Sequence, residues 1–337
     1  MQREPEYHAL AVAEVVEETA DARSFVLDVP RALEPRFAYA AGQFCTFRAT
    51  IGGEPIVRCY SMSSSPDVGD PYTVTVKRVP GGKMSSWMID TLATGDTIEV
   101  MPPTGRFVLR AVEAPIVAFA GGSGITPILS IIKTALVTTT REIELVYANR
   151  GADSVIFADA LERLRAGSGG RFSVHHHLDS EKGFLDAAAC AALVRERTQA
   201  DFYVCGPGPY MEVVAAGLDE RGIDPGRRFI EWFERPDEAA AVSHASETES
   251  IVIRLDGRKQ RIGYEPGDTI LDAARRAGLK PRFQCQAGSC GTCMAHLEGR
   301  ATMRVNNALG ADEVEEGWVL TCQTVPLSRE VIVDYDR

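Results

Sequence analysis

The first 110 residues alternate between apolar and polar positions with a period of two, as in the run TVTV at 73–76. This period is typical of strands that bury one face. Glycines and prolines separate the runs, as expected for turns between short strands. The predicted strands cover 8–18, 24–29, 43–50, 72–79 and 96–101. Residues 1–110 are therefore expected to form a small antiparallel β-barrel with one short helix.

Residues 111–236 follow a different pattern, in which short apolar runs alternate with longer helix-like stretches. The predicted strands cover 115–120, 142–148, 171–178, 201–205 and 227–233. The predicted helices cover 127–137, 154–166, 186–196 and 209–221. This alternation predicts an α/β domain with a parallel sheet covered by helices on both faces.

Few large apolar side chains occur in residues 237–248, which we interpret as a linker, although alanine and glutamate also favour a helix there. Residues 249–337 form a third unit. Asp256-Gly257 is a good turn between two strand-like runs, and Thr269–Asp272 matches a capping box that opens a short helix. The chain is therefore expected to be multidomain.

Length and charge narrow the function. The chain has 337 residues and a net charge of −11, which disfavours binding to nucleic acid or to an anionic membrane surface. No apolar run approaches a membrane span, and the first residues lack a secretory signal pattern, so a cytoplasmic location is expected. Disulfides rarely persist in that compartment, so the eight cysteines need another explanation.

Four cysteines are arranged as C-x4-C-x2-C with a fourth one later, and they are Cys285, Cys290, Cys293 and Cys322. This is the plant-type 2Fe–2S spacing. A structural zinc site is the alternative, but such sites usually pair two C-x2-C knuckles and only one is present. With CQAGSCGTC and the later LTCQ, residues 249–337 resemble a plant-type ferredoxin domain of the α+β class, which implies that the four cysteines are cluster ligands.

Two glycine-containing turns follow predicted strands of the second segment. AGGSGITP (120–127) lets backbone amides approach a pyrophosphate at the start of a helix, but it lacks the third glycine of the dinucleotide fingerprint. Alone, it fits an ordinary strand–helix turn equally well. CGP (205–207) ends a later strand, where Cys205 also fits a small buried apolar residue.

Two further motifs lie in the first segment. RCYS (58–61) combines an arginine, whose planar fork suits a pyrophosphate, with a tyrosine that offers an aromatic face and a hydroxyl. GKMS (82–85) follows about 20 residues later. Alone, the pair fits a surface arginine and a core tyrosine.

Together these motifs resemble RxYS, GxxS, GGxGxTP and CGP of the ferredoxin–NADP⁺ reductase superfamily. The resemblance implies that the first two hold FAD and that the last two flank a nicotinamide. The catalytic residues it implies are Ser61, Thr126 and Cys205. The cofactor-binding residues it implies are Arg58, Tyr60, Ser61, Gly82, Met84, Ser85, Gly121, Gly122, Gly124, Thr126, Gly206, Pro207 and Phe233. Phe233, from an E-x-F element placed against the flavin, alternatively belongs to the core face of the last strand.

The order of the three domains resembles that of the reductase components of bacterial oxygenases. In such systems the reductase delivers electrons to a steroid or aromatic-ring hydroxylase. The resemblance implies electron transfer from a nicotinamide coenzyme through FAD and a 2Fe–2S cluster to a terminal oxygenase partner. NADH is expected, but NADPH stays open because Arg150 follows the second strand of the parallel sheet. A general ferredoxin-type reductase and a zinc-bearing binding module are the alternatives.

Overall fold

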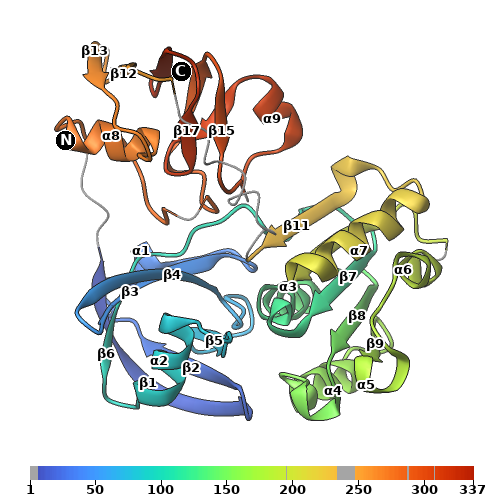
Figure 1. Ribbon diagram of the computed structural model, residues 1–337. Coiled ribbons are helices and arrows are strands. Elements are labelled where there is room, and N and C mark those ends of the chain that lie inside the picture. The colour runs from blue at the N-terminus through green and yellow to red at the C-terminus, as the bar shows by residue number, and fades with distance from the viewer. Residues whose placement is uncertain (1–6, 195, 234–246, 287, 307) are drawn as a thin grey trace. The chain divides into compact units, whose positions relative to one another are not determined.

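The computed structural model describes residues 7–194, 196–233, 247–286, 288–306 and 308–337 (Figure 1). The described residues fall into two compact units, one up to residue 233 and one from residue 247 onward. The linker predicted over 237–248 lies outside the described residues, apart from Glu247 and Thr248.

Six antiparallel strands form the first domain of the larger unit, in the order β4-β3-β6-β1-β2-β5. They are β1 (His8–Thr19), β2 (Ala22–Asp28), β3 (Phe44–Ile51), β4 (Glu54–Ser61), β5 (Thr73–Lys77) and β6 (Thr97–Val100). An isolated bridge between Met62 and Val74 joins the chain after β4 to β5, the two edges of the sheet. The predicted antiparallel barrel is confirmed.

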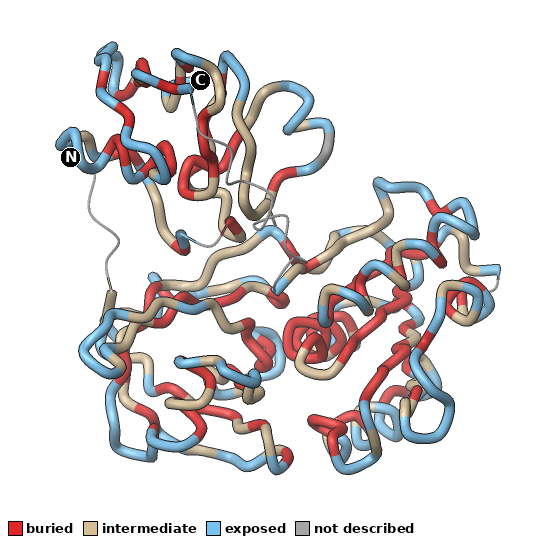
Figure 2. Tube along the Cα trace, in the orientation of Figure 1, coloured by how far each residue is buried: buried red, intermediate tan, exposed pale blue. Residues whose placement is uncertain are grey.

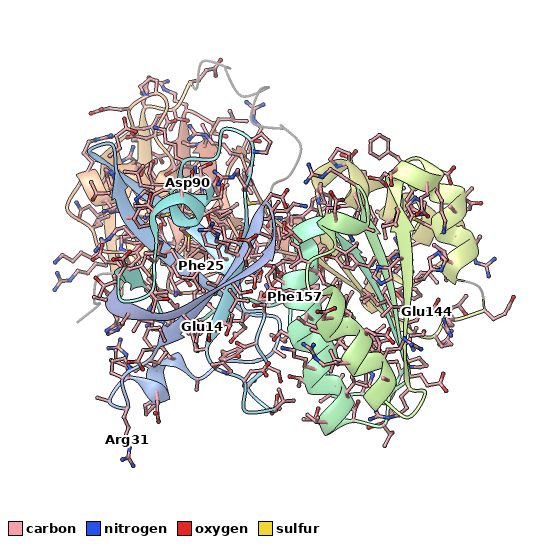
Figure 3. The ribbon with its side chains drawn as sticks, turned by 90° about the horizontal axis from the view of Figure 1, so that it is seen from below. Glu14, Phe25, Arg31, Asp90, Glu144 and Phe157 are labelled. Atoms are coloured by element: carbon pink, nitrogen blue, oxygen red, sulfur yellow. The ribbon has the colours of Figure 1, made fainter. Side chains whose placement is uncertain are left out.

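Large apolar side chains fill the barrel because they recur at every second position of its strands. Phe25 and Phe47 are completely buried there, whereas Arg31 projects away from it (Figure 3). Two helices accompany the strands, α1 (Glu34–Phe37) and α2 (Lys83–Thr91), whereas the sequence predicted one. Met84 and Met88 of α2 join the barrel core, so this helix is held against the strands through one apolar side.

Strand β4 was not among the predicted strands. Its residues are mostly exposed or half-buried, so the clean two-residue alternation is missing, and Pro55 lies at its beginning. The hairpin that pairs it with β3 turns at Gly52 and Gly53, whose φ angles of 61° and 85° suit a tight two-residue turn. The extended conformation of β4 is therefore explained by its pairing with β3 rather than by its own pattern of apolar and polar residues.

The second domain of the larger unit contains a five-stranded parallel sheet in the order β11-β10-β7-β8-β9. Its strands are β7 (Ile116–Gly121), β8 (Ile143–Asn149), β9 (Phe172–Leu178), β10 (Asp201–Gly206) and β11 (Arg228–Trp232). Its α-helices are α3 (Ile125–Thr138), α4 (Ala158–Gly167), α5 (Asp179–Lys182), α6 (Ala187–Val194) and α7 (Gly208–Glu220). Short 3₁₀ turns cover Gly122–Gly124, Ala152–Ser154 and Pro225–Arg227. The predicted α/β architecture is confirmed.

Helices cover both faces of this sheet because successive strand residues point to opposite sides. Ile116 and Ala118 pack in one apolar cluster with residues of α3 and α4. Val117 and Phe119 pack in another with residues of α6 and α7. The central strands are consequently buried along their length, as Figure 2 shows. His175–His177 lie on β9, which is an edge strand.

A buried ion pair lies at the amino end of the parallel sheet, where strand β10 begins. Asp201 begins β10, is fully buried, and accepts a 2.8 Å contact from the equally buried Arg141. Arg110 approaches the other carboxylate oxygen at 3.3 Å. Removing one partner of such a pair costs about 3–5 kcal/mol because the remaining charge is left in a dry environment.

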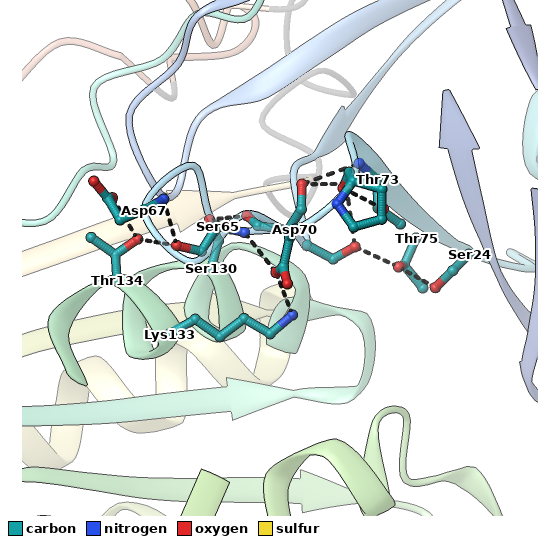
Figure 4. A network of polar contacts seen from close by, with 12 residues as sticks. Ser24, Ser65, Asp67, Asp70, Thr73, Thr75, Ser130, Lys133 and Thr134 are labelled. Atoms are coloured by element: carbon teal, nitrogen blue, oxygen red, sulfur yellow. Dashed lines mark hydrogen bonds and ion pairs between the residues drawn. The ribbon is translucent and has the colours of Figure 1, made fainter. Parts of the chain in front are cut away.

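A polar network joins the two domains of the larger unit (Figure 4). One side is the loop that follows β4, and the other is a face of helix α3. The contacts are Ser130 Oγ to Ser64 O (2.6 Å), Lys133 Nζ to Asp70 Oδ2 (2.8 Å) and Ser65 Oγ to Thr134 Oγ1 (2.7 Å). The loop directly follows RCYS and the helix directly follows the GGSG turn, so the network fixes the placement of these two motifs relative to each other.

The smaller unit is an α+β domain. A mixed sheet has the order β13-β12-β18-β14-β16, and β15 pairs with β17. Its strands are β12 (Ser250–Leu255), β13 (Arg258–Gly263), β14 (Met294–Glu298), β15 (Ala301–Met303), β16 (Trp318–Leu320), β17 (Thr324–Pro326) and β18 (Glu330–Asp334). Its helices are α8 (Ile270–Arg276) and α9 (Ala311–Glu315). The capping box predicted at Thr269 opens α8.

Among the described residues, no helix is both long enough and apolar enough to span a lipid bilayer.

Candidate flavin, nicotinamide and cluster sites

The RCYS motif occupies the end of β4. Arg58 and Tyr60 share one face of the strand, because they are two residues apart. Arg58 is exposed and donates only to the carbonyl of Val57, at 2.7 Å, among the contacts of the described chain. Tyr60 is half-buried with its ring edge-on to Phe47, and Ser61 is buried. The face therefore offers an available guanidinium beside a fixed aromatic ring, which fits a flavin nucleotide.

The GKMS motif forms the beginning of helix α2, which packs against β4. Gly82 occupies the N-cap position without a side-chain cap, so the first amides of the helix have no side-chain acceptor. Ser85 accepts a hydrogen bond from the amide of Val79 at 3.1 Å, which shapes the turn, and Met84 is buried in the core. Open amides at a helix start favour a phosphate.

The two glycine turns of the second domain meet backbone to backbone. A Cβ atom on Gly124 would lie 2.0 Å from the carbonyl oxygen of Cys205, and one on Gly121 would lie 2.9 Å from the ring of Pro207. A Cβ atom on Gly206 would lie 2.7 Å from the ring of Tyr210. Only glycine allows the two backbones to come this close. Both turns follow parallel strands and therefore lie together at the carboxyl end of the sheet, where open α/β sheets bind nucleotides.

The other residues predicted for the nicotinamide site differ in their surroundings. Thr126 is buried and donates to the carbonyl of Ser123 at 3.0 Å, so its hydroxyl shapes the glycine turn. Cys205 is fully buried, and burial raises the pKa of its thiol well above the usual value. Phe233 lies just beyond β11 and is 40% exposed. Its side chain is therefore not in the core of the last strand.

Two buried polar groups mark the same edge of the sheet. The hydroxyl of Tyr210 makes no hydrogen bond in the described chain, although it is shielded from solvent. Asn149 lies at the end of β8, and its side-chain amide has no well-formed hydrogen bond within the described chain. Its polar neighbour is Tyr147. Buried polar groups are normally paired, so an edge with unpaired ones fits a nucleotide that brings its own donors and acceptors.

Glu231 is a member of this site that sequence reasoning missed, since only Phe233 of the E-x-F element was given a role. Glu231 is 8% exposed and lies opposite Cys205 where strand β11 pairs with strand β10. Burial raises the pKa of its carboxyl to about 8. The available signal was a single acidic residue inside the apolar run RFIEW.

Glu231→Gln should therefore stabilise the protein more at pH 8.5 than at pH 5. An unfolded glutamate titrates near 4.5, so between that pH and about 8 the unfolded chain has lost a proton that the folded chain keeps. Raising the pH through this window favours unfolding, by roughly 3–5 kcal/mol once it is complete. Urea titrations of both proteins at the two pH values measure the difference, and parallel pH curves would contradict the assignment.

The four predicted cysteine ligands converge in the smaller unit. Cys285, Cys290 and Cys293 lie on the loop before β14, and Cys322 follows β16. Three are buried and Cys290 is half-buried. Gly288 and Gly291, with φ angles of 71° and 74°, allow the loop to curve, and a Cβ atom on Gly288 would lie 2.6 Å from the carbonyl oxygen of Val305.

The thiols form two pairs. The hydrogen bond that the Cys290 thiol donates to Cys285 raises the pKa of Cys290, and the hydrogen bond that Cys293 accepts from Cys322 lowers the pKa of Cys293. In the part of the chain that the structure describes, no three metal-binding side chains surround a single ion position. Two thiol pairs side by side match a centre with two irons, each of which takes two thiolates.

Three family models match successive parts of the chain. Residues 9–109 match an oxidoreductase FAD-binding domain, residues 119–216 an oxidoreductase NAD-binding domain, and residues 253–327 a 2Fe-2S iron-sulfur cluster binding domain. These are the three kinds of site that the motifs and their geometry indicate.

Similar proteins match this chain over nearly their whole length. The ferredoxin reductase component of 3-ketosteroid-9-alpha-monooxygenase from Rhodococcus rhodochrous is 36% identical, over 97% of this chain and 96% of that protein. One of the subunits of 1,2-phenylacetyl-CoA epoxidase from Escherichia coli is 33% identical, over 98% of both. The solved structure of phthalate dioxygenase reductase matches with a TM-score of 0.63 and 25% identity, over 97% of this chain and 98% of that one.

Proposed function

Since the chain belongs to the family of oxygenase reductase components with FAD-binding, NAD-binding and 2Fe–2S domains, we propose that it is the reductase of a 3-ketosteroid 9α-hydroxylase. In this role it passes electrons from NADH through FAD and the cluster to a terminal oxygenase. The observation that carries the proposal is one chain holding all three sites, together with 36% identity over nearly its full length to a relative of that name.

We assign the flavin to the RCYS and GKMS elements, where Arg58 and the first amides of α2 hold its phosphates and Tyr60 contacts its ring. Ser61 and Phe233 lie at the reactive part of this site. The glycine turns at 121–124 and 205–207 hold the nicotinamide, with Cys205 and Thr126 beside the hydride path. The four cysteines Cys285, Cys290, Cys293 and Cys322 hold the cluster.

A bound flavin accepts two electrons together from a nicotinamide and releases them one at a time, which suits a 2Fe–2S acceptor. The chain's own contribution is placement. The network between the loop after β4 and helix α3 holds the flavin elements against the nicotinamide turns, through Lys133–Asp70 and Ser65–Thr134. Geometry of this kind governs the rate, because small misplacements of reacting groups slow transfer strongly.

The proposed domains are residues 1–110 for FAD, 111–236 for NAD and 249–337 for the cluster, with a linker at 237–248. We propose a cytoplasmic location, since none of the eight cysteines, all of them among the described residues, forms a disulfide and disulfides rarely persist in that compartment. The substrate is oxidised by the partner oxygenase rather than by this chain.

Reconstitution tests the proposal. The purified protein should show flavin and cluster absorption that NADH bleaches, and it should support hydroxylation of a 3-ketosteroid by a matching oxygenase. The alternative acceptor is a phenylacetyl-CoA epoxidase, which the 33% identity to one of that enzyme's subunits favours. Turnover with that oxygenase alone would replace the steroid assignment, and a colourless protein would contradict the reductase function.

A further inference from the structure

We propose that Asp21 of the flavin-binding domain makes the coenzyme site select NADH over NADPH, by occupying Arg150 and repelling a 2′-phosphate. The inference rests on the proposed function, because it concerns the coenzyme of that same site. From the sequence alone, Arg150 leaves the choice between NADH and NADPH open.

Arg150 lies where a 2′-phosphate would be recognised. It directly follows β8, the second strand of the parallel sheet, and the residue after this strand faces the adenosine ribose in classical dinucleotide sites. In such sites a carboxylate at this place accepts the ribose hydroxyl of NAD, whereas an arginine accommodates the phosphate of NADP. On sequence position alone, Arg150 would therefore favour NADPH.

The structure shows Arg150 already engaged. Its Nη2 atom lies 2.5 Å from Oδ2 of Asp21, which belongs to the turn between β1 and β2 of the other domain. Thr19 donates to the second carboxylate oxygen at 2.9 Å, and the carbonyl of Asp21 accepts from the amide of Arg78. The carboxylate is thus held in place from its own domain, with 27% of its side chain exposed.

A second cation connects this pair to the glycine turn. Lys77 Nζ lies 3.9 Å from Oδ2 of Asp21 and 3.5 Å from the position of a Cβ atom on Gly122. Burial lowers the pKa of Lys77, and the neighbouring Asp21 opposes that shift. Positive charge therefore lies beside the glycine turn, whereas negative charge lies next to Arg150.

This arrangement accepts NADH more readily than NADPH. A 2′-phosphate would have to take Arg150 from Asp21 and remain beside the displaced carboxylate, whereas a ribose hydroxyl brings no charge. The side chain of Arg150 is 71% exposed, so the ion pair adds little to stability, and Asp21 discriminates chiefly by holding the guanidinium that a 2′-phosphate would need. The network between the two domains keeps Asp21 and Arg150 together.

The test compares Asp21→Asn, Arg150→Leu and the double variant in the full-length holoprotein. Asp21→Asn should raise kcat/KM for NADPH about five- to tenfold and change the value for NADH less than threefold, with a smaller gain at high salt. Arg150→Leu should remove that gain in the double variant. Asp28→Asn, which neutralises an exposed carboxylate at the other end of β2, should leave the ratio unchanged.

Titration of the oxidised protein with 2′,5′-ADP and with 5′-AMP gives a readout independent of turnover. Asp21→Asn should tighten binding of 2′,5′-ADP by a similar factor and leave 5′-AMP unaffected. An unchanged preference between these ligands in Asp21→Asn, or a gain that survives Arg150→Leu, would overturn the inference. Failure of both coenzymes to reduce the wild type would refute the proposed function instead, and the titration would still decide the role of Asp21.

Discussion

Cys322→Ala should abolish electron delivery to the oxygenase partner while leaving NADH-dependent reduction of ferricyanide nearly intact. Cys322 comes from a different segment than the other three cysteines and pairs with Cys293. Without its thiolate one iron loses half of its protein ligands, so the cluster should not assemble. We expect at least a 100-fold loss in partner reduction, together with loss of protein-bound iron and inorganic sulfide.

Cys190→Ala is the matched control. Cys190 is also a free, buried cysteine, but it packs in the apolar cluster of helices α6 and α7. Its replacement removes one sulfur atom from the larger unit and should leave iron, sulfide and partner reduction unchanged. Full iron content and full partner reduction in Cys322→Ala would show that the fourth ligand is misassigned, and equal loss of ferricyanide reduction would show that the defect is not confined to the cluster.

The strongest sequence signals were those encoded locally. The strands of the parallel sheet are short buried runs, so their positions could be read from composition, and β7 and β8 lie within about two residues of the predicted ranges. The cysteine spacing is equally local, because three of the four ligands fall within nine residues. Such features need no knowledge of the tertiary structure.

Features created by contacts between distant segments could not be predicted. Strand β4 carries the RCYS motif but is recognisable only through its pairing with β3. Asp21 and Arg150 are separated by 129 positions, so nothing near Arg150 indicates that its charge is neutralised. Glu231 is visible in the sequence as an acidic residue within RFIEW, but its burial comes from the sheet in which it pairs with Cys205. In each case the physical environment comes from another part of the chain.

Gly124→Ala should lower the rate of flavin reduction by NADH at least 100-fold. The backbone of Gly124, with φ of −60°, is one that alanine adopts readily, so the substitution introduces no conformational strain. Its Cβ atom would, however, lie 2.0 Å from the carbonyl oxygen and 2.4 Å from the carbonyl carbon of Cys205. Backbone atoms cannot rotate away, so the two turns must separate. A displacement of about 1 Å between reacting groups is enough for a loss of this size.

Stopped-flow measurement of flavin bleaching by NADH gives the rate, and bleaching by dithionite shows whether FAD is bound and reducible in the same sample. Gly167→Ala supplies the control, since a Cβ atom there meets nothing within 4 Å and Gly167 ends helix α4. Gly121→Ala, whose contacts at 2.9 Å are with side chains, should give a milder defect if Gly124→Ala does not fold. Normal bleaching by NADH in both Gly124→Ala and Gly121→Ala would mean that hydride transfer does not depend on the close approach of the two turns.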